Sequence, residues 1–471
     1  MIIISTVISG QLEELEHKGL GKLLLKYFFC GLCFYLLIGL IKGLETSIDG
    51  YYGNAELNVI LNTNLIINIF LATGSIIGIG GSVLLTIKLA LKDKDKAEEV
   101  LGNSIALFIV FSLVLFLLAY FYKDFIFNKF IHIGNEQLKT MTITYFIARL
   151  SGVTFILMAE YLILFIVAAG NPLKALLLKF ISFILKTIVL LSCLMFNLGF
   201  VYRAIMLNLV DLIIVLLILK HFTKRKGNIL KLKWNNLKFK KTSLYIFIIG
   251  LFPFLFFLTQ RFYDIGINYL VNFNNEQLIS IGIIKRSLYS PVLTILSALA
   301  WLRPIFAYNY IKNNFVRIKK LFLYCTLILF LILIVVFIPL VFTKKIINLF
   351  THDFAKISIA KKLIKNYIFI TPLILFKTII FVYLQSTSKK LKLALIYLSN
   401  ILLIIIPLYL IWRFHLEIGF DGWLYLNNTI AFLMFIVSLI FFIIEFKKLN
   451  SKPQDREDDE NCIKKKLLNV T

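Results

Sequence analysis

The chain has 471 residues, of which 60% are hydrophobic. A soluble domain cannot bury that much apolar surface, so lipid must solvate most of the chain. The formal net charge of +26 comes mostly from lysine. We interpret it as the charge of cytoplasmic loops and expect no nucleic-acid partner.

Twelve apolar runs are long enough to cross a bilayer, which takes roughly 20 residues of helix. The runs are continuous rather than alternating, which predicts helices and not an outer-membrane barrel. Six lie in the first half, near 24–46, 57–90, 101–122, 141–169, 174–196 and 200–221. Six lie in the second half, near 243–271, 278–308, 320–343, 364–386, 391–412 and 422–446.

Loop charges predict the topology and the division of the chain. The loop 221–241 carries eight lysines and arginines, so the positive-inside rule places it and both termini in the cytoplasm. We expect a first six-helix half at 20–222, a basic cytoplasmic linker at 223–242 and a second half at 243–447. The mixed-charge tail 448–471 is expected to be disordered. The N-terminus has no basic region before its apolar residues, so it is not a cleavable signal.

The stretch Gly74–Asn103 organises the first half. Glycines at 74, 78, 80 and 81 remove side chains from a helix, which predicts that another helix or a cavity wall comes close. A Lys/Asp loop follows, and a weaker copy of this plan, Trp301–Lys320, lies about 220 residues later. Two halves on one plan are typical of secondary transporters. The fold class is therefore an all-α polytopic membrane protein, with two pseudo-symmetric six-helix halves around a central cavity.

Acidic residues inside the apolar runs are the candidate ion- or substrate-binding groups, because a charge within a membrane is costly. In the first half they are Glu45, Glu160 and Asp211. In the second half Asp264 lies between Gln260 and Asn268 at four-residue spacing, a polar stripe that would face a cavity. The alternative at Glu160 is a structural ion pair with a residue on another helix, and the alternative at Asp264 is a structural pair with Arg261.

Basic residues also occur within or near the runs. Lys179 and Lys186 are seven apart and share a helix face, and Lys285, Arg286, Arg303 and Lys377 lie in the second half. Snorkelling explains those near helix ends. The deeper ones leave open an anionic substrate.

Other chemistry is not indicated. The five histidines have no ligand spacing, no Walker A sequence occurs, and Cys30 and Cys33 form a CxxC inside an apolar helix. We therefore expect no metal, no cofactor other than a coupling ion, and no enzyme.

Several motifs occur together, in order and at consistent spacing. They are Gly80–Leu89 with Lys94–Ala97, Arg303–Tyr310 with Arg317, Leu349–Asp353, Gln385–Ala394, Ile406–Leu408 and Gly419–Gly422. With these motifs the chain resembles the multidrug and toxic compound extrusion (MATE) transporters, within a superfamily that includes polysaccharide and lipid II flippases. Departures occur at Ala90, at Ile311–Lys312, and at Glu45, where many members have an aspartate.

The resemblance implies a monomeric antiporter of the cytoplasmic (inner) membrane. It would export amphipathic, often cationic compounds in exchange for H⁺ or Na⁺. If the coupling ion is Na⁺, the candidate sites are Glu45, by its alignment with the family's aspartate, and Asp264, by its polar stripe. The alternative is a flippase for a lipid-linked sugar or cell-wall precursor.

Overall fold

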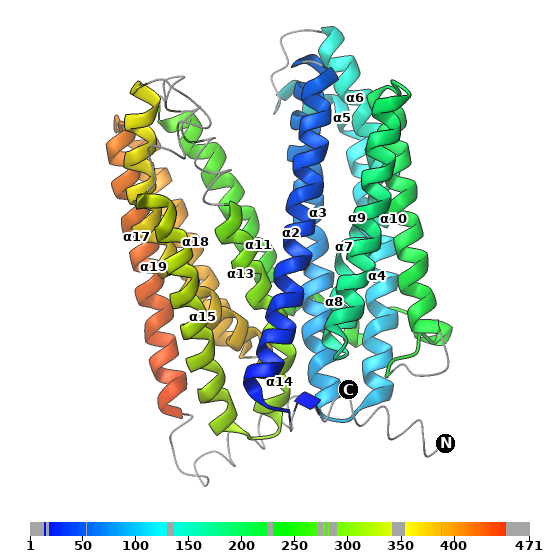
Figure 1. Cartoon of the computed structure of the whole chain (residues 1–471), viewed down its shortest axis with the longest axis vertical. Coiled ribbons are helices and arrows are strands. Elements are labelled where there is room, and N and C mark those ends of the chain that lie inside the picture. The colour runs from blue at the N-terminus through cyan, green and yellow to red at the C-terminus, as the bar shows by residue number, and fades with distance from the viewer. Residues whose placement is uncertain are drawn as a thin grey trace. The chain divides into compact units, whose positions relative to one another are not determined.

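A computed structural model describes most of the chain, and every regular element in that part is helical. The described residues are 14–15, 18–52, 54–129, 136–223, 229–271, 277, 281, 290–341, 354–387 and 389–448. The tail expected to be disordered lies almost entirely outside them. Figure 1 shows long helices, joined by short connections. The chain forms two compact units: unit 1 is mainly Phe29–Phe254, and unit 2 combines Gly19–Phe28 with the chain from Leu255 onward.

Unit 1 contains the helices of the first half and the start of the next helix. Its elements are α2 (Leu20–Tyr52, from Phe29 onward), α3 (Asn54–Ala90), α4 (Lys94–Phe121), α5 (Lys123–Lys129), α6 (Glu136–Leu150), α7 (Val153–Tyr161), α8 (Ile163–Ala168), α9 (Pro172–Met195), α10 (Phe200–Thr223), the 3-10 turn η1 (Trp234–Asn236) and α11 (Lys241–Leu270, up to Phe254). Helices α9 and α10 lie side by side (Figure 1).

Unit 2 contains the start of α2, the rest of α11 and the helices that follow α11. These are α13 (Ser290–Leu299), η3 (Ala300–Leu302), α14 (Arg303–Ile311), α15 (Phe315–Val341), α17 (Phe354–Ser386), α18 (Lys390–Arg413) and α19 (Phe420–Lys448). Helix α17 packs against α15, α18 and α19.

The apolar runs account for this architecture. Each of the twelve predicted runs overlaps described helix. Nine helices among the described residues are long and apolar enough to cross a membrane, and a tenth span forms if the bent pair α6 and α7–α8 is counted as one. The pair bends by 54° at a break around Gly152. The predicted all-α membrane fold is confirmed.

Glycines bring α3 and α11 into backbone contact within unit 1. A Cβ added to Gly80 would collide with the carbonyl oxygen of Ile246, and one added to Gly250 would collide with that of Ile76. Gly74 and Gly78 face Tyr161, and Gly81 faces Phe165 and Ser104. The predicted close approach at the glycine stretch is confirmed. Its partners are the start of α11 together with α4, α7 and α8.

The described part of the basic linker is docked on the start of α4. Ile229 and Leu230 are buried, and the Leu232 amide donates to the Phe222 carbonyl oxygen at 3.0 Å. The Lys231 amide donates to the Glu98 carboxylate at 3.2 Å. Glu98 is only 1% exposed, so this loop supplies the polar partners that its buried carboxylate requires.

Lysines of the linker complete this docking through ion pairs. Lys233 lies 2.8 Å from Glu98 and 2.9 Å from Asp95, and Lys240 lies 3.0 Å from Glu99. Hydrogen bonds to Glu98 and then to Asp95 raise the pKa of Lys233 above its ordinary value. A raised lysine pKa stabilises the folded form at every pH below the ordinary lysine value, so the contact is fully present at neutral pH.

Replacement of Gly80 by alanine is expected to destabilise unit 1. The new methyl group meets backbone, which cannot rotate away, and overpacking of this kind costs roughly 1–3 kcal/mol. A lower melting temperature in detergent, followed by fluorescence-detected size exclusion, measures the effect. Gly43→Ala is the matched control, because nothing lies near its added Cβ. Equal melting temperatures for the two variants would contradict a tight α3–α11 contact.

Replacement of Glu98 by alanine is expected to release the linker from α4. The variant loses two charge-assisted contacts, each worth about 1.5–3 kcal/mol. Trypsin should then cleave faster after Lys231 and Lys233, as measured by the time course of the two half-chain fragments. Asp95→Ala is the control, since Asp95 is 91% exposed and makes only a surface pair. Unchanged cleavage in Glu98→Ala would show that the linker is held by its apolar residues alone.

Candidate functional site: a buried charge network in unit 1

A lysine–glutamate pair joins α7 to α9. The Lys179 ammonium lies 2.6 Å from the Glu160 carboxylate, and the two side chains are 7% and 25% exposed. The same ammonium lies 5.1 Å from the centre of the Phe34 ring on α2. Glu160 is thus the more accessible member of a pair that is largely shielded from its surroundings.

A second acid lies deeper, on α10. Asp211 is 1% exposed, and its carboxylate lies 2.7 Å from the Lys186 ammonium and 3.8 Å from the Arg149 guanidinium. Arg149 also donates to the Asn208 side-chain oxygen at 2.8 Å. One carboxylate therefore joins cations from α6 and α9, with Asn208 fixing the direction of the arginine.

The bend between α6 and α7 shapes this part of the network. The Asn208 amide donates to the Ala148 carbonyl oxygen at 2.9 Å, near the C-terminus of α6 where carbonyls lack helical partners. A Cβ on Gly152 would collide with the Asn208 side chain. Glycine at the break thus lets Asn208 hold the end of α6 and the guanidinium of Arg149 together.

The network carries more positive than negative charge. Three cations, Arg149, Lys179 and Lys186, surround two acids, which gives a formal net charge of +1 (three minus two). Each acid is within 3 Å of a lysine, so both acids are compensated in this conformation. A proton or a cation arriving at Glu160 would compete with Lys179, and an anion would compete with Glu160 for the lysine.

The structure brings together some predicted residues and not others. Glu160 and Asp211 belong to one network, linked through α9, which carries Lys179 and Lys186. At Glu160 the structure shows an ion pair to another helix, which was the alternative to a binding role, and Asp211 also pairs with cations of two other helices. Glu45 is half-buried on α2 and stays a prediction. The side chains of Asp264, Gln260 and Asn268, on α11, lie outside the described residues, so their polar stripe also stays a prediction.

The sequence predicts that the two lysines of α9 share a helix face, but it does not predict which acids they contact. Their seven-residue spacing placed them on one helix face, yet only the fold assigns Lys179 to Glu160 and Lys186 to Asp211. Arg203, which is 2% exposed on α10, was missed, although an arginine inside an apolar run is itself a signal.

A polar chain in unit 2 involves one of the predicted basic residues. Arg303 donates to the Gln385 side-chain oxygen at 2.9 Å, and the Gln385 amide donates to the Tyr397 hydroxyl at 2.8 Å. The Tyr397 ring stacks on Phe381 with centroids 4.9 Å apart. Arg303 and Gln385 come from two of the motifs identified in the sequence, so these motifs position α14 against α17 and α18.

Comparisons with known proteins identify the fold. The family model MatE matches residues 284–411. The chain contains a MatE domain and has the MATE transporter fold. No curated protein gives a match to this sequence.

Solved structures with this fold align with almost the whole chain. A MOP superfamily transporter from Pyrococcus furiosus, described as having a binding pocket of reverse polarity, aligns with a TM-score of 0.80 at 15% identity over 93% of this chain and 98% of its own. A MATE family transporter in an outward-facing conformation aligns with a TM-score of 0.81 at 15% identity, over 93% of this chain and 98% of its own. The Vibrio cholerae MATE transporter VcmN in its bent form aligns with a TM-score of 0.77 at 15% identity, over 94% of this chain and 98% of its own. The MATE resemblance seen in the sequence is confirmed.

Breaking the Glu160–Lys179 pair on one side only is expected to destabilise this MATE fold. Glu160→Gln or Lys179→Gln alone leaves a buried charge without its main partner, at a cost of about 3–5 kcal/mol. The double variant removes both charges and should recover most of the loss. The melting temperatures of the four proteins in detergent show whether the loss in the double variant is smaller than the sum of the two single losses.

The control is a double-variant cycle at Glu136 and Lys139. This pair lies 3.5 Å apart on α6, but Glu136 is 88% exposed, so little coupling is expected. Additive effects at Glu160 and Lys179 would contradict a buried ion pair.

Proposed function

We propose that this chain is a secondary active exporter of the MATE type. It exports amphipathic, often cationic organic compounds in exchange for H⁺ or Na⁺. The fold supports transport in general, and the charge network of unit 1 supports ion coupling in particular. The proposal places the protein in the cytoplasmic membrane as a monomer, with both termini in the cytoplasm on the evidence of loop charge.

The observation that carries the coupling is the Glu160–Lys179 pair. An exchanger needs a group whose charge is compensated in turn by the ion and by the substrate. Protonation of Glu160 removes the negative charge that holds the Lys179 ammonium at 2.6 Å. A cationic substrate instead replaces the ammonium while the carboxylate stays ionised. Because both use the same carboxylate, their binding is mutually exclusive, which is what couples opposite fluxes.

Asp211 is the supporting acid in this proposal. With Lys186 and Arg149 both near its carboxylate and 1% exposure, it is less accessible than Glu160. It pairs with Lys186, which lies on the same face of α9 as Lys179 because the two lysines are seven residues apart. Glu45 and Asp264 remain the proposed sites for Na⁺ if the coupling ion is Na⁺.

The excess of cations in the network favours a second candidate, a flippase for a lipid-linked sugar. A lipid phosphate or pyrophosphate would pair with Lys179 and Lys186 in place of the acids. In that function Glu160 and Asp211 act as counter-ions that are displaced by the substrate, and no ion gradient is consumed at this site.

Transport in proteoliposomes separates the two candidates. With an imposed pH or Na⁺ gradient, ethidium uptake is expected in the wild type and should be abolished in Glu160→Gln, which fixes a neutral side chain. Glu136→Gln, on the exposed end of α6, should transport normally. The same assay applies to Glu45→Gln and Asp264→Asn. Wild-type uptake in Glu160→Gln, Glu45→Gln and Asp264→Asn would refute carboxylate-coupled exchange.

The flippase candidate is measured on the same vesicles without a gradient. A fluorescent polyprenyl-diphosphate sugar is incorporated, and its movement between leaflets is followed by quenching with dithionite. Antiport predicts no movement above that of protein-free vesicles. Movement that is lost in Lys179→Gln, together with no ethidium uptake, would replace the exporter by the flippase.

A further inference from the structure

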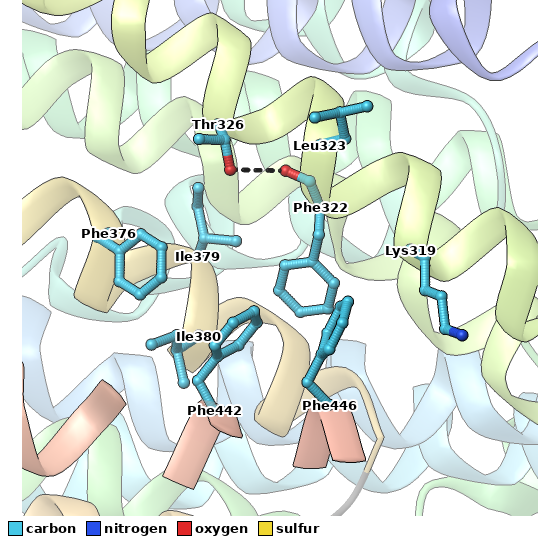
Figure 2. Close-up of a pocket in the computed structure, with 9 residues that line it drawn as sticks. All are labelled: Lys319, Phe322, Leu323, Thr326, Phe376, Ile379, Ile380, Phe442 and Phe446. Carbon is cyan, nitrogen blue, oxygen red and sulfur yellow. Dashed lines mark hydrogen bonds between the residues drawn. The ribbon is translucent and has the colours of Figure 1, made fainter. Parts of the chain in front are cut away.

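An apolar pocket lies between α15, α17 and α19 of unit 2. Its volume is about 190 Å³, and Figure 2 shows its lining side chains. Four phenylalanines form much of the wall, Phe322 from α15, Phe376 from α17, and Phe442 and Phe446 from α19. Three helices that are distant in the sequence thus build one cavity.

The aromatic wall is fixed by edge-to-face packing. The Phe322 and Phe442 ring centroids are 5.2 Å apart at 69°, and those of Phe376 and Phe442 are 5.5 Å apart at 77°. Such arrangements are favourable for aromatic pairs, so the rings support one another without a ligand. The pocket is therefore preformed rather than opened by rotation of a side chain.

The pocket opens toward lipid rather than water. Leu323, which lines it, is 59% exposed, and Leu327 and Phe330, further along α15, are 52% and 65% exposed. Helices α17 and α19 are both candidate membrane spans. Large apolar side chains exposed on such helices face acyl chains, so the occupant of the pocket enters from the bilayer.

The pocket is large enough for part of a hydrocarbon chain but too small for a drug-sized ligand. Sites for drug-sized molecules span roughly 300–1,000 Å³, and this one is smaller. It has few polar groups to orient a ligand: the Thr326 hydroxyl already donates to the Phe322 carbonyl oxygen at 2.9 Å. An extended hydrocarbon chain needs no oriented partner and fits this lining.

Positive charge gathers where the pocket ends. Lys319 lies at one edge of the pocket, with its ammonium directed away from the phenylalanines (Figure 2). Glu445, next to Phe446 on α19, forms ion pairs with both Lys389 and Lys392, so it leaves no net negative charge there. Basic residues beside an apolar groove between membrane helices attract anionic lipid headgroups.

We propose that this pocket holds one acyl chain of an anionic phospholipid, with the lipid phosphate beside the Lys319 ammonium. The lipid seals the groove between α15 and α19 and ties both to α17. This site is separate from the charge network, and it does not depend on what the protein transports.

Photocrosslinking in vesicles tests the site. Full-length protein is reconstituted with a trace of phosphatidylglycerol or phosphatidylcholine that carries a diazirine on one acyl chain. After irradiation, labelled peptides are mapped by mass spectrometry. The expected result is labelling of α15 and α19 pocket peptides, stronger with phosphatidylglycerol.

Two variants with matched controls make the assignment specific. Leu323→Trp closes the mouth and should remove most pocket labelling, whereas Leu327→Trp, one turn away and equally lipid-facing, should not. Lys319→Gln should lower the preference for phosphatidylglycerol by about fivefold, the effect of one lysine near an anionic headgroup. Lys320→Gln, on exposed surface, should leave it unchanged.

Three outcomes would overturn the proposal. One is equal labelling by the two lipids in the wild type. Another is full labelling in Leu323→Trp. The third is displacement of the label by ethidium, which would make the pocket a site for organic cations. Elution of each variant as a single symmetric peak with the wild-type volume is required before labelling, so that a loss of signal reports the site and not misfolding.

Discussion

The contact between α3 and α11 is the constraint on which unit 1 depends most. Gly80 faces the backbone of α11, and Gly250 faces the backbone of α3, so each helix supplies a glycine where the other supplies a carbonyl oxygen. Within a bilayer, apolar side chains gain nothing by leaving lipid for one another, and close backbone packing is what holds helices together. The reciprocal glycines allow that packing and fix which residues of α3 and α11 face each other.

The charge network depends on a second local feature, the bend between α6 and α7 at Gly152. The bend frees carbonyl oxygens at the end of α6, Asn208 satisfies one of them, and the same side chain orients Arg149 toward Asp211. One side chain thus both satisfies the end of α6 and holds the arginine of the charge network. A substitution at Asn208 would therefore disturb the helix end and the cation together.

The sequence predicts the helices well because lipid enforces a simple rule. Each span must be long, apolar and internally hydrogen-bonded, and these are properties of a single segment. The glycines at 74–81 likewise predict that other helices come close to α3. Which charges meet is a property of several segments at once. The acids Glu160 and Asp211 stood out in their own helices, but their assignment to Lys179 and Lys186 needed α7, α9 and α10 in register. The pocket of unit 2 could not be predicted from the sequence, because phenylalanines are common in membrane-spanning helices.

The docked linker has a consequence for how the chain is made. Unit 1 includes residues as far as Phe254, and its α4 holds a nearly buried glutamate whose partners, Lys231 and Lys233, are synthesised more than 130 residues later. Domains generally fold as units while the chain emerges, N-terminal first. Here the first unit stays incomplete until the linker and the start of α11 have left the ribosome. A gene split within 223–242 would therefore yield an N-terminal fragment with an exposed glycine face and an acid that has lost its linker partners, whereas a split after α11 would keep both contacts in one polypeptide.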